Sequence, residues 1–491
     1  MRIGQTSLIT FVSKVLASVF GFVATIYFAR ELGAEVLGIY SIIIALTAWF
    51  NLIGNIGIGK ATSKRISEGN EPGAYLSTGM LLSGALIIVP LVVIFFADSL
   101  LESYVEGFAE ISPVSVVWVI SGLVVVNWLR GYIRVVLNST HLVHVSAMLK
   151  TLQIGLRSVI QVSLVIIGWG LIGMLFGYAL GALLVVLLGS YFVTVRPKMP
   201  GLRHFKNIAN YAKYSWLSGL KSRAYNDIDI LLLGIFVSKS LVGIYSVAWT
   251  ITKFLDMFGV AVSTALFPEI SEISAQESKE AAAGLIEDSL TYGGFVVIPG
   301  LVGGSLLADR LLKIYGTEFV QGTEILWLLL VSMVFYTYLQ QLLNSLNAID
   351  RPDLAFWTNV VFLGSNITLN IILIWALGWV GAAIASATSA LLGLIVSYLL
   401  VVQVVTIKPP TNEIANQVAA ALGMGCLVKI LDVLVRETRI VQHNFAIVLG
   451  LVFIGAGTYV ISLLIISGQF RQIVSRNLPF ESVNRVLLAE K

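Results

Sequence analysis

Four basic side chains occur within long apolar stretches of the sequence, where a charge is costly. Lys14, Arg130, Arg134 and Arg157 each lie among residues hydrophobic enough to cross a lipid bilayer. An ionisable side chain inside a membrane is tolerated when it faces a polar cavity or a partner, so it indicates a functional site. We therefore predict that these four residues line a cationic cavity.

The spacing of neighbouring polar residues supports this cavity, because it places them on single helix faces. The three polar stripes are Thr10, Lys14, Ser18 and Thr25; Asn127, Arg130, Arg134 and Asn138; and Lys150, Gln153, Arg157 and Gln161. The alternative for Arg130, Arg134 and Lys150 is that they lie near a helix end and extend to the lipid headgroups.

A second group of charges combines both signs within one predicted helix. Arg223 and Asp227 are four residues apart and can neutralise each other along the helix. Asp229 lies about 200° around the helix from Asp227 and needs another partner. We predict that Asp229 binds a proton or a cation, or pairs with a basic residue across the cavity; a purely structural salt bridge is the alternative.

An uncharged polar stripe follows in a later apolar segment. Tyr336, Gln340, Asn344 and Asn347 recur at helical spacing. Amides can hydrogen-bond hydroxyl groups without attracting ions, so we predict sugar contacts at Gln340 and Asn344. The alternative is that these residues hold neighbouring helices together.

The composition requires a membrane around the elements that carry these side chains. The chain has 491 residues, of which 57% are hydrophobic and only 12% are charged. Water-soluble domains cannot bury so much apolar surface. The first apolar stretch does not resemble a cleavable signal peptide, so we expect it to be a retained membrane helix.

We predict an all-α polytopic membrane protein with about fourteen transmembrane helices, because each crossing needs about 20 apolar residues. The predicted spans are 8–30, 38–60, 77–97, 114–137, 143–168, 171–195, 209–237, 240–267, 284–308, 322–347, 354–377, 379–405, 411–435 and 443–467. Basic residues are more frequent in alternate connections, which predicts a cell-membrane protein with both termini in the cytoplasm.

An internal repeat organises the predicted helices. Gly243-Ile244-Tyr245-Ser246 repeats Gly38-Ile39-Tyr40-Ser41 at an offset of 205 residues, 243 minus 38. Leu346-Asn347 likewise matches Leu137-Asn138 at an offset of 209, 346 minus 137. Because each copy has six spans, we predict two lobes in parallel, related by a pseudo-twofold axis. The predicted boundaries are 1–200 for the first lobe, 201–408 for the second, and 409–491 for two further helices and a tail.

Motifs for other chemistry do not occur in the sequence. There is no phosphate-binding G-x-x-x-x-G-K-[ST] loop, so direct coupling to ATP within the chain is not expected. Cys426 is the only cysteine, and it has no His or Cys neighbour at metal-ligand spacing. We therefore expect a transporter rather than an enzyme, with no bound metal or organic cofactor.

Three stretches resemble the polysaccharide-transport flippases. They are 28–41, FARELGAEVLGIYS; 229–246, with an acid, an apolar run and Gly-Ile-Tyr-Ser; and 378–385, GWVGAAIA. The family, which includes the O-antigen (Wzx-like) repeat-unit flippases, belongs to the multidrug/oligosaccharidyl-lipid/polysaccharide exporter superfamily. Asp229 matches the family's acid in the seventh span.

The resemblance implies that the chain moves a lipid-linked oligosaccharide across the cytoplasmic membrane by alternating access. Such a substrate carries a polyprenyl phosphate or pyrophosphate, whose negative charge would suit the cationic cavity. The main alternative is an ion-coupled multidrug exporter of the same superfamily. That class would be expected to place carboxylates in the first lobe. Spans 1–6 have no Asp or Glu that is clearly placed in the middle of the membrane. A membrane glycosyltransferase or polymerase is a weaker alternative.

These interpretations also define the expected partners. They are the lipid-linked oligosaccharide, the bilayer and glycosyltransferases or a polymerase of the same pathway. No nucleic acid is expected. A proton or a sodium ion, bound at Asp229, is the only predicted coupling species.

Overall fold

The computed structural model describes residues 3–54, 57–215, 217–438 and 443–477, with side chains except at 3–18, 213–224, 473 and 476–477. These ranges are almost entirely helical and contain no strand. Twelve helices within them are long and apolar enough to cross a membrane. The prediction of an all-helical, multi-pass membrane protein is confirmed, while the number fourteen stays a prediction.

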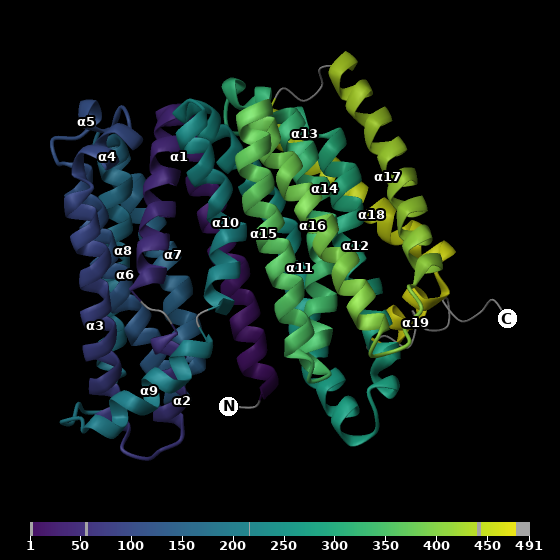
Figure 1. Cartoon of the computed structure of the whole chain (residues 1–491). Helices are drawn as coiled ribbons and strands as arrows, with labels where there is room; N and C mark the ends of the chain where they lie inside the picture. Colours follow the sequence, from purple (N-terminus) through teal and green to yellow (C-terminus); the bar gives the residue numbers. More distant parts are fainter. Residues whose placement is uncertain (1–2, 55–56, 216, 439–442, 478–491) are drawn as a thin grey trace. The chain divides into compact units, whose positions relative to one another are not determined.

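The chain divides into two compact units, Met1–Ser246 and Val247–Lys491. The first contains α1 (Ile3–Ile53), α2 (Ile58–Ser67), α3 (Pro72–Phe96), α4 (Asp98–Tyr104), α5 (Phe108–Ile111), α6 (Val116–Ser139), α7 (Val143–Ile166), α8 (Gly170–Tyr191), α9 (Leu202–Ser215), α10 (Leu217–Phe236) and the start of α11 (Lys239–Gln276). In this unit α7 packs against both α1 and α8, and α6 packs against α8 (Figure 1).

The second unit contains the rest of α11 and then α12 (Ala283–Leu306), α13 (Ala308–Lys313), α14 (Thr323–Ala348), α15 (Pro352–Leu377), α16 (Trp379–Val402), α17 (Thr411–Thr438), α18 (Asn444–Ile466) and α19 (Gly468–Asn477). Here α16 packs against α14 and α15, while α17 packs against α12 and α18. The lobe boundaries proposed from the repeat stay a prediction. They assign α10 to the second lobe, whereas α10 packs against α1 in the first unit.

Helix α1 supplies two of the predicted crossings. A straight α-helix of its 51 residues would be about 75 Å long, more than twice the thickness of a bilayer core. Gly33 interrupts the helix with φ 82° and ψ 175°, a conformation that only glycine adopts without strain. The segment after the kink ends at Ile53 rather than at the predicted residue 60. After Gly57, with φ 71°, the polar sequence of α2 forms a separate helix.

The two copies of the repeated tetrapeptide pack directly on each other. A Cβ atom built on Gly38 would lie 1.8 Å from the carbonyl oxygen of Lys239, and one built on Gly243 would lie 1.9 Å from that of Ala34. The contact is reciprocal, since Lys239 and Ala34 each precede their glycine by four residues. Such a reciprocal contact is what two repeated elements make around an approximate twofold axis. Glycine is needed at both positions because the two helix backbones touch.

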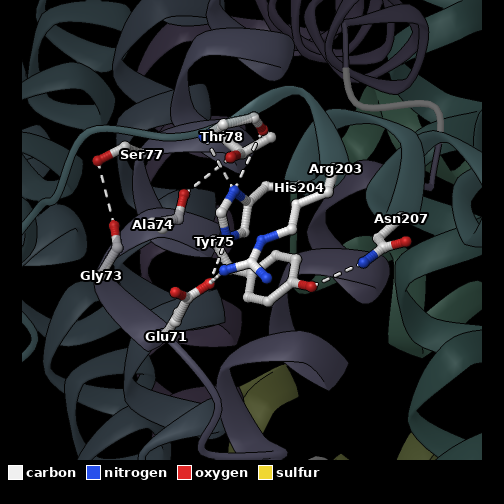
Figure 2. A network of polar contacts seen from close by, with 10 residues as sticks. Glu71, Gly73, Ala74, Tyr75, Ser77, Thr78, Arg203, His204 and Asn207 are labelled. Carbon is white, nitrogen blue, oxygen red and sulfur yellow. Dashed lines mark hydrogen bonds and ion pairs between the residues drawn. The ribbon is translucent and has the colours of Figure 1, made fainter.

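The start of α9 is attached to the start of α3 by a charged network (Figure 2). Glu71 accepts hydrogen bonds from Arg203 at 2.5 Å and from His204 Nε2 at 2.7 Å. Asn207 donates to the Tyr75 hydroxyl at 2.8 Å, while Ile208 on the same helix joins an apolar cluster shared with α2 and α3. Helix α9 is therefore held by both polar and apolar contacts.

The network predicts that the docking of α9 weakens in acid. The hydrogen bond from His204, together with the charge of Arg203, lowers the pKa of Glu71 below its ordinary value. A lowered carboxyl pKa contributes stability at neutral pH, which is lost as the pH falls through the folded-state pKa. We expect the protection of the α9 amides, corrected for the intrinsic exchange rate at each pH, to fall as Glu71 protonates. Glu71→Gln should exchange faster at neutral pH and lose most of this pH dependence; an unchanged profile would contradict the prediction.

Within the second unit, a buried ion pair joins the two C-terminal membrane helices, α17 and α18, to α13. Arg310 on α13 donates to Asp432 on α17, and the Asp432 side chain is only 2% exposed. Arg436 donates to the other oxygen of Asp432 at 2.9 Å, and Asn444 Nδ2 donates to the Arg310 carbonyl at 2.8 Å. Because every charge here has a partner, we interpret the network as structural.

Candidate functional site

Two of the predicted cavity arginines, Arg157 and Arg134, interact with the same tyrosine of the first unit, Tyr178. The guanidinium carbon of Arg157 on α7 lies 5.3 Å from the centroid of the Tyr178 ring on α8, a cation–π distance. The Tyr178 hydroxyl donates to Asn127 Oδ1 on α6 at 3.2 Å. Arg130 and Arg134 share a face of α6 with Asn127, and the charges of Arg130 and Arg134 interact.

Two glycines of α8 determine where the backbone of Arg157 lies. A Cβ atom on Gly181 would lie 2.9 Å from Arg157 Cα, and one on Gly177 would lie 2.9 Å from Gln161 Cα. Small residues four apart allow membrane helices to approach backbone to backbone. Because α7 rests directly on α8 at this point, the side chain of Arg157 starts next to α8 and its guanidinium lies over the Tyr178 ring.

Gln161 and Tyr40 form a hydrogen-bonded polar pair next to Arg157. Gln161 is buried and donates from Nε2 to the Tyr40 hydroxyl at 3.1 Å and to the Met174 carbonyl at 2.6 Å. The Tyr40 hydroxyl lies close enough to Arg157 for the two to interact electrostatically. Gln161 belongs to the polar stripe seen in the sequence, whereas Tyr40 and Tyr178 were missed. For Tyr40, membership in the repeated tetrapeptide was the available signal.

The arginines have no anionic partner within the described part of the chain. None of the ion pairs there involves Arg130, Arg134 or Arg157. The Nε atoms of Arg130 and Arg157 are buried and form no hydrogen bond, while Arg134 is exposed. Unpaired donors in a membrane protein are costly, so the geometry suits an anion that supplies the missing acceptors.

Asp229 has a partner that the sequence did not reveal. The Tyr245 hydroxyl donates to Asp229 Oδ2 at 2.5 Å, and the two side chains are 0% and 5% exposed respectively. Tyr245 is the repeat equivalent of Tyr40, so one copy lies beside a cation and the other beside an acid. Asp227 is half-buried on α10. The side chains of Lys14 and Arg223 lie outside the described residues.

Removing the Tyr245 hydroxyl should destabilise the first unit. Tyr245→Phe leaves Asp229 without this donor, and a hydrogen bond to a charged group contributes about 2 kcal/mol. We expect a measurable loss of thermal stability in detergent. The matched control is Tyr191→Phe, because Tyr191 is 86% exposed. Equal melting temperatures for the two variants would contradict a role for the Asp229 hydrogen bond in stability.

The predicted sugar contacts lie in the second unit, on α14. Gln340 and Asn344 are both half-buried. Their neighbour Gln341 is buried and structural, since it donates to the Gly259 carbonyl at 2.9 Å and accepts from Ser263 Oγ at 2.8 Å. The amide that joins α14 to α11 is thus adjacent to the predicted stripe rather than within it. Among the described residues, no group of three His, Cys, Asp or Glu side chains could hold a metal ion.

Comparisons with known proteins agree on one family. The family described as "Polysaccharide biosynthesis protein" matches residues 3–274, and the MatE family matches residues 201–372. The chain is 30% identical over 487 residues to the probable flippase AglR of Haloferax volcanii, covering 97% of this chain and 98% of the relative. It is 26% identical over 453 residues to the probable low-salt glycan biosynthesis flippase Agl15 of the same organism, covering 92% and 94%.

A solved structure shares the fold over nearly the whole chain. The lipid II flippase MurJ, in an inward closed conformation, superimposes with a TM-score of 0.76. The match covers 95% of this chain and 100% of MurJ at 18% sequence identity, so it supports the fold alone. With the family match over more than half of the sequence, the chain belongs to the polysaccharide biosynthesis protein family of the multidrug/oligosaccharidyl-lipid/polysaccharide exporter superfamily.

Proposed function

We propose that this protein is a flippase that moves a lipid-linked oligosaccharide across the membrane for the assembly of a cell-surface glycan. The observation that carries the proposal is the group of three arginines on α6 and α7, two of which interact with Tyr178 and none of which has an anionic partner among the described residues. The flippase names of the relatives support the same substrate class. The substrate is released unchanged in its covalent structure.

The charge of the lipid carrier explains why the site is cationic. A polyprenyl phosphate or pyrophosphate must bring its negative oxygens through an apolar layer, where an unpaired charge is unfavourable. Arginine offers several N–H donors in a planar fork that matches phosphate oxygens. The site would therefore offset the desolvation of the phosphate group during the crossing. Lys14, on α1, is proposed as a further member of this cationic cavity.

The glycan needs different chemistry from the phosphate. Sugar hydroxyls form neutral hydrogen bonds, for which the amides of Gln340 and Asn344 are suited. We assign the glycan contacts to this stripe of α14. Replacing Asn344 with leucine is the direct test of the assignment, because it removes the amide while keeping a similar volume.

Coupling to an ion gradient is assigned to Asp229. A carboxylate within a membrane helix can take up a proton or bind a sodium ion, and the Tyr245 hydroxyl would hold it in one orientation. Asp227 and Arg223 are proposed as a neutralised pair beside it. Collapse of both the proton and the sodium gradients should stop net transport, and undiminished transport would remove the coupling role.

The proposed setting is the cytoplasmic membrane, with both termini in the cytoplasm. Basic residues on α2 and near the start of α9 support this orientation under the positive-inside rule. Enzymes that assemble or polymerise the glycan on the same lipid carrier are the proposed functional partners.

The decisive experiment is reconstitution into lipid vesicles with a fluorescent polyprenyl pyrophosphate that carries one N-acetylglucosamine. Transfer of the probe between leaflets, read by a membrane-impermeant quencher, is the expected result. The MatE family match makes a multidrug exporter the second candidate. Transport of a cationic dye without transfer of the lipid probe would favour that candidate instead.

A further inference from the structure

The arginines of the first unit lie at different heights along the helix axes. Tyr178 contacts Asn127 on α6 and Arg157 on α7, so these two residues lie at one level. Arg130 and Arg134 follow Asn127 by three and seven residues. At 1.5 Å per residue, they lie roughly 4.5 Å and 10.5 Å further along α6 towards Ser139.

Counting from the helix ends gives the same order. Helix α6 ends at Ser139 and α7 begins at Val143, so the short turn between them places both ends at one level. Arg134 lies five residues before the end of α6, roughly 7.5 Å from it, and Arg157 lies fourteen residues after the start of α7, roughly 21 Å. The separation of about 13 Å agrees with the 10.5 Å obtained through Tyr178.

The environments of the arginines change with this height. Arg134 is exposed and close to the end of α6 that faces the cytoplasm in the proposed orientation. Arg157 is half-buried and held by the close contact of α7 with α8, the Tyr178 ring, and the nearby Gln161 and Tyr40. Arg130 lies between them, with a buried Nε atom that lacks a hydrogen bond.

We propose that the first unit holds the phosphate group of the lipid carrier at two successive stations. Arg134 and Arg130 form a loading station, and Arg157 with Tyr178 forms a deep station. This proposal rests on the proposed flippase function and adds an order of events to it. The group recognised is a phosphoryl group on a lipid, whether it is a phosphate or a pyrophosphate.

A pair of stations solves a problem that one strong site would create. A single cluster that bound the phosphate tightly enough to draw it into the membrane would also hold it there. Sites of moderate strength in series allow entry and release, as in ion-conducting pores. Arg130 and Arg134 also repel each other when empty, and an anion between them relieves that repulsion. Tyr178, which contacts Arg157 and Asn127 and interacts electrostatically with Arg134, is placed to link the two stations.

The test separates loading from transit in reconstituted vesicles. The initial rate of probe transfer is measured against the mole fraction of the fluorescent pyrophosphate-linked sugar for the wild type, Arg134→Gln and Arg157→Gln. Arg134→Gln removes a charge-assisted contact at the loading station. It should raise the half-saturating mole fraction of the probe about tenfold and change the maximal rate by less than about twofold. Arg157→Gln should lower the maximal rate about a hundredfold at a nearly unchanged half-saturating fraction.

The controls distinguish this proposal from the one on which it rests. Arg134→Lys should restore most of the loading because it keeps the charge, and Lys313→Ala, at an exposed position on α13, should behave as the wild type. A wild type that moves no probe overturns the flippase function itself. An active wild type in which both glutamine variants change the same parameter, or in which Arg134→Gln changes neither, overturns the two stations alone.

Discussion

Replacing Arg157 with alanine should abolish transfer of the lipid-linked sugar while leaving the protein folded and inserted. The guanidinium of Arg157 is the deepest of the described cations of the site and lies over the Tyr178 ring. Without it, a phosphate at this level has no positive partner, and loss of the interaction should slow transfer at least about a hundredfold. The rate is measured with the fluorescent probe in vesicles at a saturating mole fraction.

Lysine at the same position provides the matched comparison. Arg157→Lys keeps the charge but loses the planar fork of donors, so it should retain part of the rate. Lys313→Ala removes a cation from an exposed position elsewhere and should have no effect. Insertion is checked by elution as a single species and by the melting temperature. Wild-type rates in both Arg157 variants would show that the cationic site does not act on the substrate.

Substituting either glycine of the tetrapeptide contact should have the largest effect on stability. In Gly38→Ala the new Cβ atom would lie 1.8 Å from the Lys239 carbonyl oxygen, and in Gly243→Ala 1.9 Å from that of Ala34. Both obstacles are backbone atoms, which cannot rotate away as a side chain could. The helices must separate, and we expect a cost of about 3 kcal/mol for each variant, at the upper end for overpacking.

A glycine in open surroundings gives the control for this prediction. Gly122 lies within α6, and nothing lies within 4 Å of a Cβ atom built there. Gly122→Ala should therefore leave the melting temperature unchanged or raise it slightly, because alanine favours the helix by about 1 kcal/mol. Melting temperatures in detergent compare the three variants. If Gly38→Ala and Gly243→Ala melt like Gly122→Ala, the two helices do not touch at these residues.

The contact also bears on the internal repeat. The sequence shows the tetrapeptide twice but cannot tell whether the copies meet. In the structure the copies do meet, because Gly38 packs against the backbone of Lys239 and Gly243 packs against the backbone of Ala34. Ala34 and Lys239 occupy equivalent positions in the two copies. The same repeat places Tyr40 and Tyr245 in opposite electrostatic surroundings, beside Arg157 and Asp229 respectively. The two copies of the tetrapeptide thus place their tyrosines beside charges of opposite sign.

The sequence by itself determined that this is an all-helical membrane protein and that polar residues form stripes on its helices. Both conclusions are local, since apolar length and a period of 3.6 residues can be read within one segment. For the same reason Arg130 and Arg134 could be placed on one face of a helix. The kink at Gly33 falls between the predicted spans 8–30 and 38–60. The sequence therefore indicated the break, but not that a single glycine would make it within one long helix.

Only the tertiary structure decided which of these stripes meet. Tyr178 is 51 residues from Asn127, and Gln161 is 121 residues from Tyr40; no periodicity within one segment reports contacts over such distances. The glycines of α8 set the approach of α7, and that approach brings Arg157 to Tyr178. Likewise, a hydroxyl sixteen residues away satisfies Asp229, because the turn between α10 and α11 returns the chain alongside itself. The sequence shows which residues are charged and with which sign, but the partners of these residues depend on how the helices pack.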